Sequence, residues 1–227
     1  MTGNAKIWTA AIVLALLHVV VLFAGFVAPA DPTSQNRELP FVPPSRPHFV
    51  DARGHFHLRP FVYAWISKPQ SLYEYEESRD REYSLHFFVK GPEYGIVGVF
   101  SSSIHLFGVE APAQIFLAGS DNYGRDQFSR ILYGGRVSLA AGLLATGISL
   151  FLGLLLGTIS GFYGNWIDES LMRMVELFLV LPWLYLLLAV RAFLPLHITP
   201  MQTFFLLVTV IGSIGWARPA RLVRGVV

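Results

Sequence analysis

The chain has 227 residues, of which 53% are hydrophobic and only 14% are charged, and its mean hydropathy is +0.50. A water-soluble domain has about a quarter of its residues charged, so this composition excludes a disordered chain and indicates a membrane protein. The net charge of +2 provides no global field for a nucleic acid, and the absence of Cys excludes disulfide scaffolds, iron–sulfur clusters and thiol nucleophiles.

Four apolar segments approach the roughly 20 helical residues that cross a bilayer core about 30 Å thick. They are expected to be transmembrane helices and cover residues 7–28, 137–162, 171–194 and 201–217. The third is the least uniform, because it contains Arg173, Glu176, Pro182 and Arg191. The fourth follows Thr199-Pro200, a suitable cap and first turn. The fold class is therefore an α-helical integral membrane protein with about four transmembrane helices.

The distribution of basic residues predicts the orientation in the membrane. Residues 195–200, expected as an outer loop, carry no charge, whereas Arg218, Arg221 and Arg224 lie in the expected cytoplasmic C-terminus, residues 218–227. An even number of spans then places residues 1–6 and the loop 163–170 in the cytoplasm. A cleaved signal peptide is the alternative for the first segment, but its apolar run exceeds the usual core of about 7–15 residues. We favour an uncleaved anchor.

Between the first two spans, residues 29–122 are predicted to form an extracytoplasmic linker followed by a small β-rich insert. The linker is rich in Pro and polar residues. Strand-like runs cover residues 48–51, 56–65, 84–90, 94–100 and 104–110, with turns predicted at 51–54 and at Gly91-Pro92-Glu93. The acidic run 73–82 is predicted to be a solvated helix or turn. It lacks the Gly that a calcium loop requires.

A metal site is the alternative interpretation of three histidines, His48, His55 and His57. His55 and His57 would share one strand face, which suits a chelate. The alternation around them is typical of an ordinary strand, and no pattern of carboxylates accompanies it. We therefore predict no metal, no cofactor and no catalytic residue, and hence no enzyme, because no span holds paired polar groups suited to catalysis.

Residues 116–139 read FLAGSDNYGRDQFSRILYGGRVSL. This segment resembles the signature that precedes the second span in peptide-type permeases of ABC importers, the dipeptide, oligopeptide and nickel class, with Ser120 in place of the usual Thr. The matching residues taken as the family signature, structural or interfacial in role, are Asp121, Gly124, Arg125, Asp126, Arg130, Tyr133, Gly134 and Arg136. Residues 161–168 and 215–225 also resemble family motifs. Residues 123–136 are predicted to be a separate helix at the outer interface.

The resemblance implies a permease subunit of an ATP-driven importer of peptides or related small solutes in a bacterial-type inner (plasma) membrane. Its implied partners are a second permease subunit that shares the translocation pathway, cytoplasmic ABC ATPases, an extracytoplasmic solute-binding protein and membrane lipid, with no nucleic acid. Typical members continue with a coupling loop and two further helices, so we expect a partial permease. The alternative is a non-transporting anchor that displays a β-rich sensor or scaffold domain.

The second span carries Gly153, Gly157 and Gly161 at every fourth position. Small residues at this spacing leave one helix face flat, so that another helix can approach closely. The partner is either a helix of the same subunit, which we favour, or a second subunit.

Overall fold

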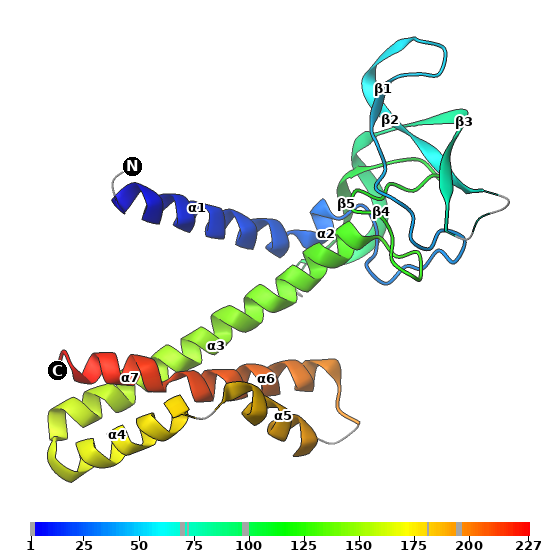
Figure 1. Ribbon diagram of the computed structural model, residues 1–227. Helices are drawn as coiled ribbons and strands as arrows, with labels where there is room; N and C mark the ends of the chain where they lie inside the picture. Colours follow the sequence, from blue (N-terminus) through cyan, green and yellow to red (C-terminus); the bar gives the residue numbers. More distant parts are fainter. Residues whose placement is uncertain (1–2, 69–70, 72, 97–99, 181, 194–196) are drawn as a thin grey trace. The chain divides into compact units, whose positions relative to one another are not determined.

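The computed structural model describes residues 3–68, 71, 73–96, 100–180, 182–193 and 197–227, and the chain divides into two compact units (Figure 1). The first, Met1–Val137, contains five strands, the start of α3 (Gln127–Tyr163), and the helices α1 (Gly3–Leu22) and α2 (Ala24–Val27). The second, Ser138–Val227, contains the rest of α3 with α4 (Asn165–Val180), α5 (Trp183–Phe193), α6 (Pro200–Gly215) and α7 (Ala217–Arg224).

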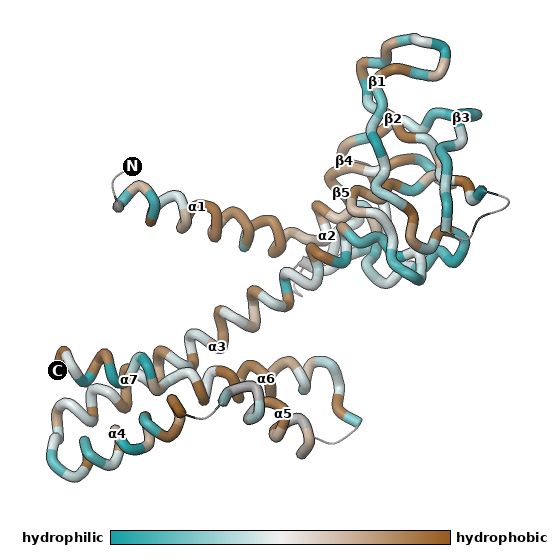
Figure 2. The backbone as a smooth tube through the Cα atoms, in the orientation of Figure 1, coloured by the Kyte–Doolittle hydropathy of each residue, from teal (hydrophilic) through white to brown (hydrophobic). Residues whose placement is uncertain are grey.

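Three helical segments among the described residues are long and apolar enough to cross a membrane: Asn4–Leu22, Gln127–Tyr163 and Pro200–Arg224. Figure 2 shows α1 and α6 largely in the brown of hydrophobic residues. The prediction of a helical membrane protein is thereby confirmed. The chain gives three candidate spans, however, where the sequence suggested four.

The difference lies in residues 171–194, predicted to be a single span. They fall on α4 and α5, which have 16 and 11 residues, each shorter than a membrane crossing requires. Pro182 separates the two helices. It has no backbone N–H to donate, so it cannot continue the hydrogen-bond pattern of a helix; the residue before it lies outside the described part of the chain. The outer loop predicted at 195–200 also lies partly outside it.

One continuous helix, α3, includes the predicted interfacial helix 123–136 from Gln127 onward and the whole predicted span 137–162. It begins at Gln127 and extends for 37 residues, about 55 Å at 1.5 Å per residue. No proline interrupts it, so nothing in the backbone separates an interfacial part from a spanning part.

The helix α6 begins at the predicted cap. The Thr199 side chain accepts from the Gln202 backbone N–H, and the Gln202 side chain accepts from the Thr199 N–H.

The strands form two small antiparallel sheets. The first has the order β1 (His48–Val50), β2 (Phe56–Ser67) and β3 (Tyr75–Ser84), and the second pairs β4 (His86–Ile96) with β5 (Phe100–Gly108). The three-stranded sheet begins with a hairpin at the predicted place, where β1 is followed by β2.

Two local predictions are wrong. The acidic run 73–82 is largely strand β3, at the edge of its sheet, where charged side chains face solvent and discourage further pairing. Its pairing with β2 buries Tyr83 opposite Val62. Gly91-Pro92-Glu93 is no hairpin turn, because β4 continues through it. The register with β5 shifts between Lys90 and Tyr94, so a bulge accommodates the proline.

The core of the β-rich part contains side chains from both sheets and from the segment that follows β5. Val62, Tyr83, Ala113 and Ile115 are buried together, and Phe107 packs against them. The proline-rich segment, predicted to be an extended linker, is attached to this core. The Tyr75 hydroxyl of β3 donates a hydrogen bond of 2.5 Å to the carbonyl of Pro40 in this segment. The Trp65 indole of β2 donates to the hydroxyl of Ser45, also in this segment, at 3.2 Å.

Candidate functional site

The signature segment places Asp121 at the centre of a turn. Its Oδ1 accepts the backbone N–H groups of Tyr123 and Arg125 at 2.9 and 3.0 Å, and its Oδ2 accepts from Arg125 Nε at 2.7 Å. Arg130 Nε lies 3.7 Å from the same Oδ2. Burial alone would raise the pKa of Asp121, but the hydrogen bonds from Arg125 and Tyr123 outweigh it and leave the pKa below its usual range. Asp121 is therefore an ionised anchor for two arginines.

The turn lies directly against the proline-rich segment. Gly124 has φ of +69°, and a Cβ atom there would lie 1.8 Å from the backbone oxygen of Asn36. The Ser120 hydroxyl accepts from the Val42 N–H at 2.8 Å and donates to the Leu39 carbonyl at 2.6 Å. We call residues 119–130 together with residues 36–42 the signature clasp. Its polar atoms hold the segment after α2 against the start of α3.

Asp126 caps α3 at the edge of the clasp. Its Oδ2 accepts from the backbone N–H and the hydroxyl of Ser129 at 2.8 and 2.5 Å, and Asp126 is only 3% exposed. Its Oδ1 is buried without a partner among the described residues, and Asp126 is one of the residues that line a cavity of about 330 Å³. Burial raises the pKa of Asp126, although the hydrogen bonds from Ser129 act in the opposite direction. The carboxyl group thus fixes the beginning of the long helix.

The remaining signature residues lie outside the Asp121 cluster. Tyr133 packs near Ala24, Ala28 and Leu132, and Arg136 Nη1 donates to the Gly95 carbonyl at 3.3 Å. A Cβ atom at Gly134 would meet nothing within 4 Å.

Sequence reasoning assigned no role to His105, which is 3% exposed. Its Nδ1 lies 2.7 Å from the Ala28 carbonyl and its Nε2 lies 3.0 Å from the Pro92 carbonyl. It therefore joins the end of α2 to the bulge of β4. A single histidine in a strand-like run gives no sequence signal for such contacts.

In the second unit, the three spaced glycines of α3 face α7 and the end of the chain. A Cβ atom would lie 2.5 Å from Pro219 Cβ at Gly153, 2.6 Å from the Ala220 carbonyl at Gly157 and 2.9 Å from Val227 Cβ at Gly161. The absence of side chains therefore permits the close approach within this chain. Beside this contact, Trp216, Ala217, Ala220 and Val175 form a buried cluster.

Two further motifs of the resemblance meet at the polar end of this contact. The Ser160 hydroxyl, fully buried, donates to Asp168 Oδ1 at 2.5 Å, and Arg224 pairs with Asp168 Oδ2. Asp168 comes from the motif at 161–168 and Arg224 from the motif at 215–225, so these separate segments form one cluster.

These arrangements indicate a structural role for the signature and for the motif at 161–168, because their carboxylates accept hydrogen bonds that fix a turn, a helix start and a helix pair. Asp121 and Asp168 each hold an arginine, and Asp126 holds a helix end. Such contacts define the positions of the helices relative to one another within each unit.

Comparison with known proteins relates part of the chain to transport permeases, although no family model matches it. It is 40% identical over 86 residues to a dipeptide transport system permease protein of Alkalihalophilus pseudofirmus, which is 38% of this chain and 28% of that protein. It is 40% identical over 83 residues to a glutathione transport system permease protein of Pectobacterium atrosepticum, covering 37% and 28%. It is 31% identical over 126 residues to an oligopeptide transport system permease protein of Bacillus subtilis, covering 56% and 39%.

The matched region thus spans between about a quarter and two fifths of these relatives' length. The similarity confirms the resemblance to peptide-type transport permeases that the sequence motifs indicated. These relatives are named as transport system permease proteins.

Proposed function

We propose that this chain is a permease component of an ATP-driven importer for peptides or related small solutes. The observation that supports the proposal is the identity of 31–44% to permease proteins of peptide transport systems. The apolar helices of the chain agree with such a role. The protein itself would perform no covalent chemistry.

The proposed location is the inner membrane, with both termini in the cytoplasm and the β-rich part outside. Arg218, Arg221 and Arg224 support a cytoplasmic C-terminus. Two cytoplasmic ends require an even number of crossings, so we propose that α4 and α5 together form the fourth. Such broken crossings occur where other protein segments shield the backbone polar groups freed at the break, here at Pro182.

The proposed partners are a second permease subunit, cytoplasmic ABC ATPases and an extracytoplasmic solute-binding protein. The two permeases would line a pathway whose access alternates between the two sides as the ATPases act. The β-rich part, placed outside the membrane, is then available to the binding protein.

Co-purification from the native cell tests this function. We expect an affinity-tagged chain, extracted in mild detergent, to retain a related permease and an ATP-hydrolysing subunit that mass spectrometry identifies. An unrelated multi-pass protein with the same tag is the control. Retention of neither subunit, with peptide uptake unchanged after deletion of the gene, would contradict the proposal and favour the anchor that displays a sensor or scaffold domain.

A further inference from the structure

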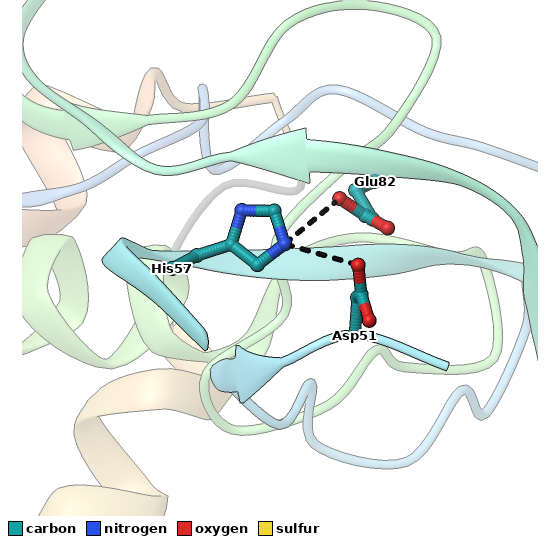
Figure 3. A group of neighbouring side chains, drawn as sticks. All are labelled: Asp51, His57 and Glu82. Carbon is teal, nitrogen blue, oxygen red and sulfur yellow. Dashed lines mark hydrogen bonds and ion pairs between the residues drawn. The ribbon is translucent and has the colours of Figure 1, made fainter. Parts of the chain in front are cut away.

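We propose that the β-rich part binds a divalent metal ion of the zinc type through Asp51, His57 and Glu82 (Figure 3). The sequence led us to predict no metal, because the alternation around the histidines is typical of an ordinary strand and no pattern of carboxylates accompanies it. The fold brings two carboxylates, those of Asp51 and Glu82, next to His57. Asp51 follows β1, His57 lies on β2 and Glu82 lies on β3, so three neighbouring strands bring the side chains together. The proposal does not depend on the transport function.

The spacing of the donor atoms fits a tetrahedral ion. One donor atom from each of the three residues lies within 4.8 Å of the others. His57 Nε2 is 3.3 Å from Asp51 Oδ2 and 3.6 Å from Glu82 Oε2. Zinc bonds to nitrogen and oxygen are about 2.0–2.2 Å long, so two ligands of a tetrahedron lie about 3.4 Å apart. Figure 3 shows the His57 ring nitrogen directed at both carboxylates.

The Asp51 carboxylate is oriented before any ion binds. Its Oδ1 accepts the backbone N–H groups of Arg53 and His55, both at 2.8 Å, and its side chain is 7% exposed. Its Oδ2 receives no backbone hydrogen bond from the part of the chain that the structure describes, and it faces the imidazoles of His55 and His57. A carboxylate whose direction is fixed by two backbone hydrogen bonds is a prepared metal ligand.

The other two ligands leave the position open to solvent. The side chains of His57 and Glu82 are 37% and 36% exposed, so an ion can enter and water can complete its shell. The His57 ring packs edge-on against Phe61, with centroids 5.1 Å apart, which restrains its orientation. His55 Nδ1 lies 3.1 Å from Asp51 Oδ2 and can support that ligand from outside. One imidazole with two carboxylates suits zinc better than calcium or magnesium, which prefer oxygen alone.

A second histidine–carboxylate pair on the same sheet serves as the matched control. His48 Nε2 lies 3.0 Å from Glu77 Oε2, but this pair belongs to no three-ligand group among the described residues. If the Asp51 cluster were only an ion pair of the same kind, neither cluster would bind metal.

The test is calorimetric titration of the full chain with Zn²⁺ in detergent, after chelator treatment and with a tag that contains no histidine. We expect one Zn²⁺ per chain, an affinity at least about tenfold weaker in His57→Gln and in Glu82→Gln, and unchanged binding in His48→Gln. Circular dichroism confirms that each variant is folded. If His57→Gln does not fold, Glu82→Gln at the sheet edge decides the question. Absence of Zn²⁺ binding, or equal binding in the folded cluster variants, would overturn the proposal.

Discussion

Replacing Gly124 with alanine is expected to unfold the signature clasp. The backbone there has φ of +69°, which costs an alanine about 1–2 kcal/mol. The added Cβ would also lie 1.8 Å from the Asn36 backbone oxygen, which has no rotamer that could relieve the overlap. We expect the free energy of unfolding of the first unit to fall by about 3 kcal/mol or more in total. Thermal unfolding of the purified chain in detergent measures this change.

The matched control is Gly54→Ala. Gly54 has φ of +85°, but a Cβ atom there would meet nothing within 4 Å. This variant should show only the conformational cost of about 1–2 kcal/mol. Equal destabilisation by the two variants would mean that the turn does not press against the segment at Asn36, and the account of the clasp would be wrong.

Replacing Gly157 with alanine is expected to separate α3 from α7 in the second unit. The added Cβ would lie 2.6 Å from the Ala220 carbonyl and 2.9 Å from Val223 Cβ, so the helices must move apart. Alanine is otherwise the better helix former by about 1 kcal/mol. We expect the overlap to dominate, with a net loss of about 1–3 kcal/mol in the free energy of unfolding. Unfolding in mixed detergent micelles with increasing SDS measures it.

Gly147→Ala provides the control on the same helix, because nothing lies within 4 Å of a Cβ atom there. This change should be neutral or stabilising, whereas Gly157→Ala should be destabilising. Stabilisation by both would indicate that α7 does not pack on the glycine face.

The sequence predicted the apolar helices and the first hairpin because both depend on local patterns. Residues 7–28 contain no Asp, Glu, Lys or Arg, and the turn at 51–54 joins two strand-like runs. The sequence-based prediction was wrong where pairing with a distant segment decides the secondary structure. Tyr75–Ser84 is polar enough for a solvated helix, yet it becomes an edge strand because its backbone pairs with β2 and Tyr83 enters the core.

In the candidate site, too, local features could be predicted from the sequence and tertiary contacts could not. The signature residues were identified from their order in the chain, but their contacts were not, since the partners of Gly124 and Ser120 lie some eighty residues earlier, at Asn36 and Val42. The contact between Asp168 and Arg224 likewise depends on how the helices fold back. No spacing rule links residues so far apart, so only the fold could show them together.

Labelling of single cysteines most directly tests the claim that the β-rich part lies outside the membrane and the C-terminus inside. The chain has no Cys, so Arg79→Cys on β3 and Val226→Cys each introduce a unique thiol at an exposed position. In intact cells, a membrane-impermeant maleimide that reaches the periplasm should label Arg79→Cys at once and Val226→Cys only after the membrane is permeabilised. Protection of Arg79→Cys in intact cells, or immediate labelling of Val226→Cys, would contradict the proposed topology.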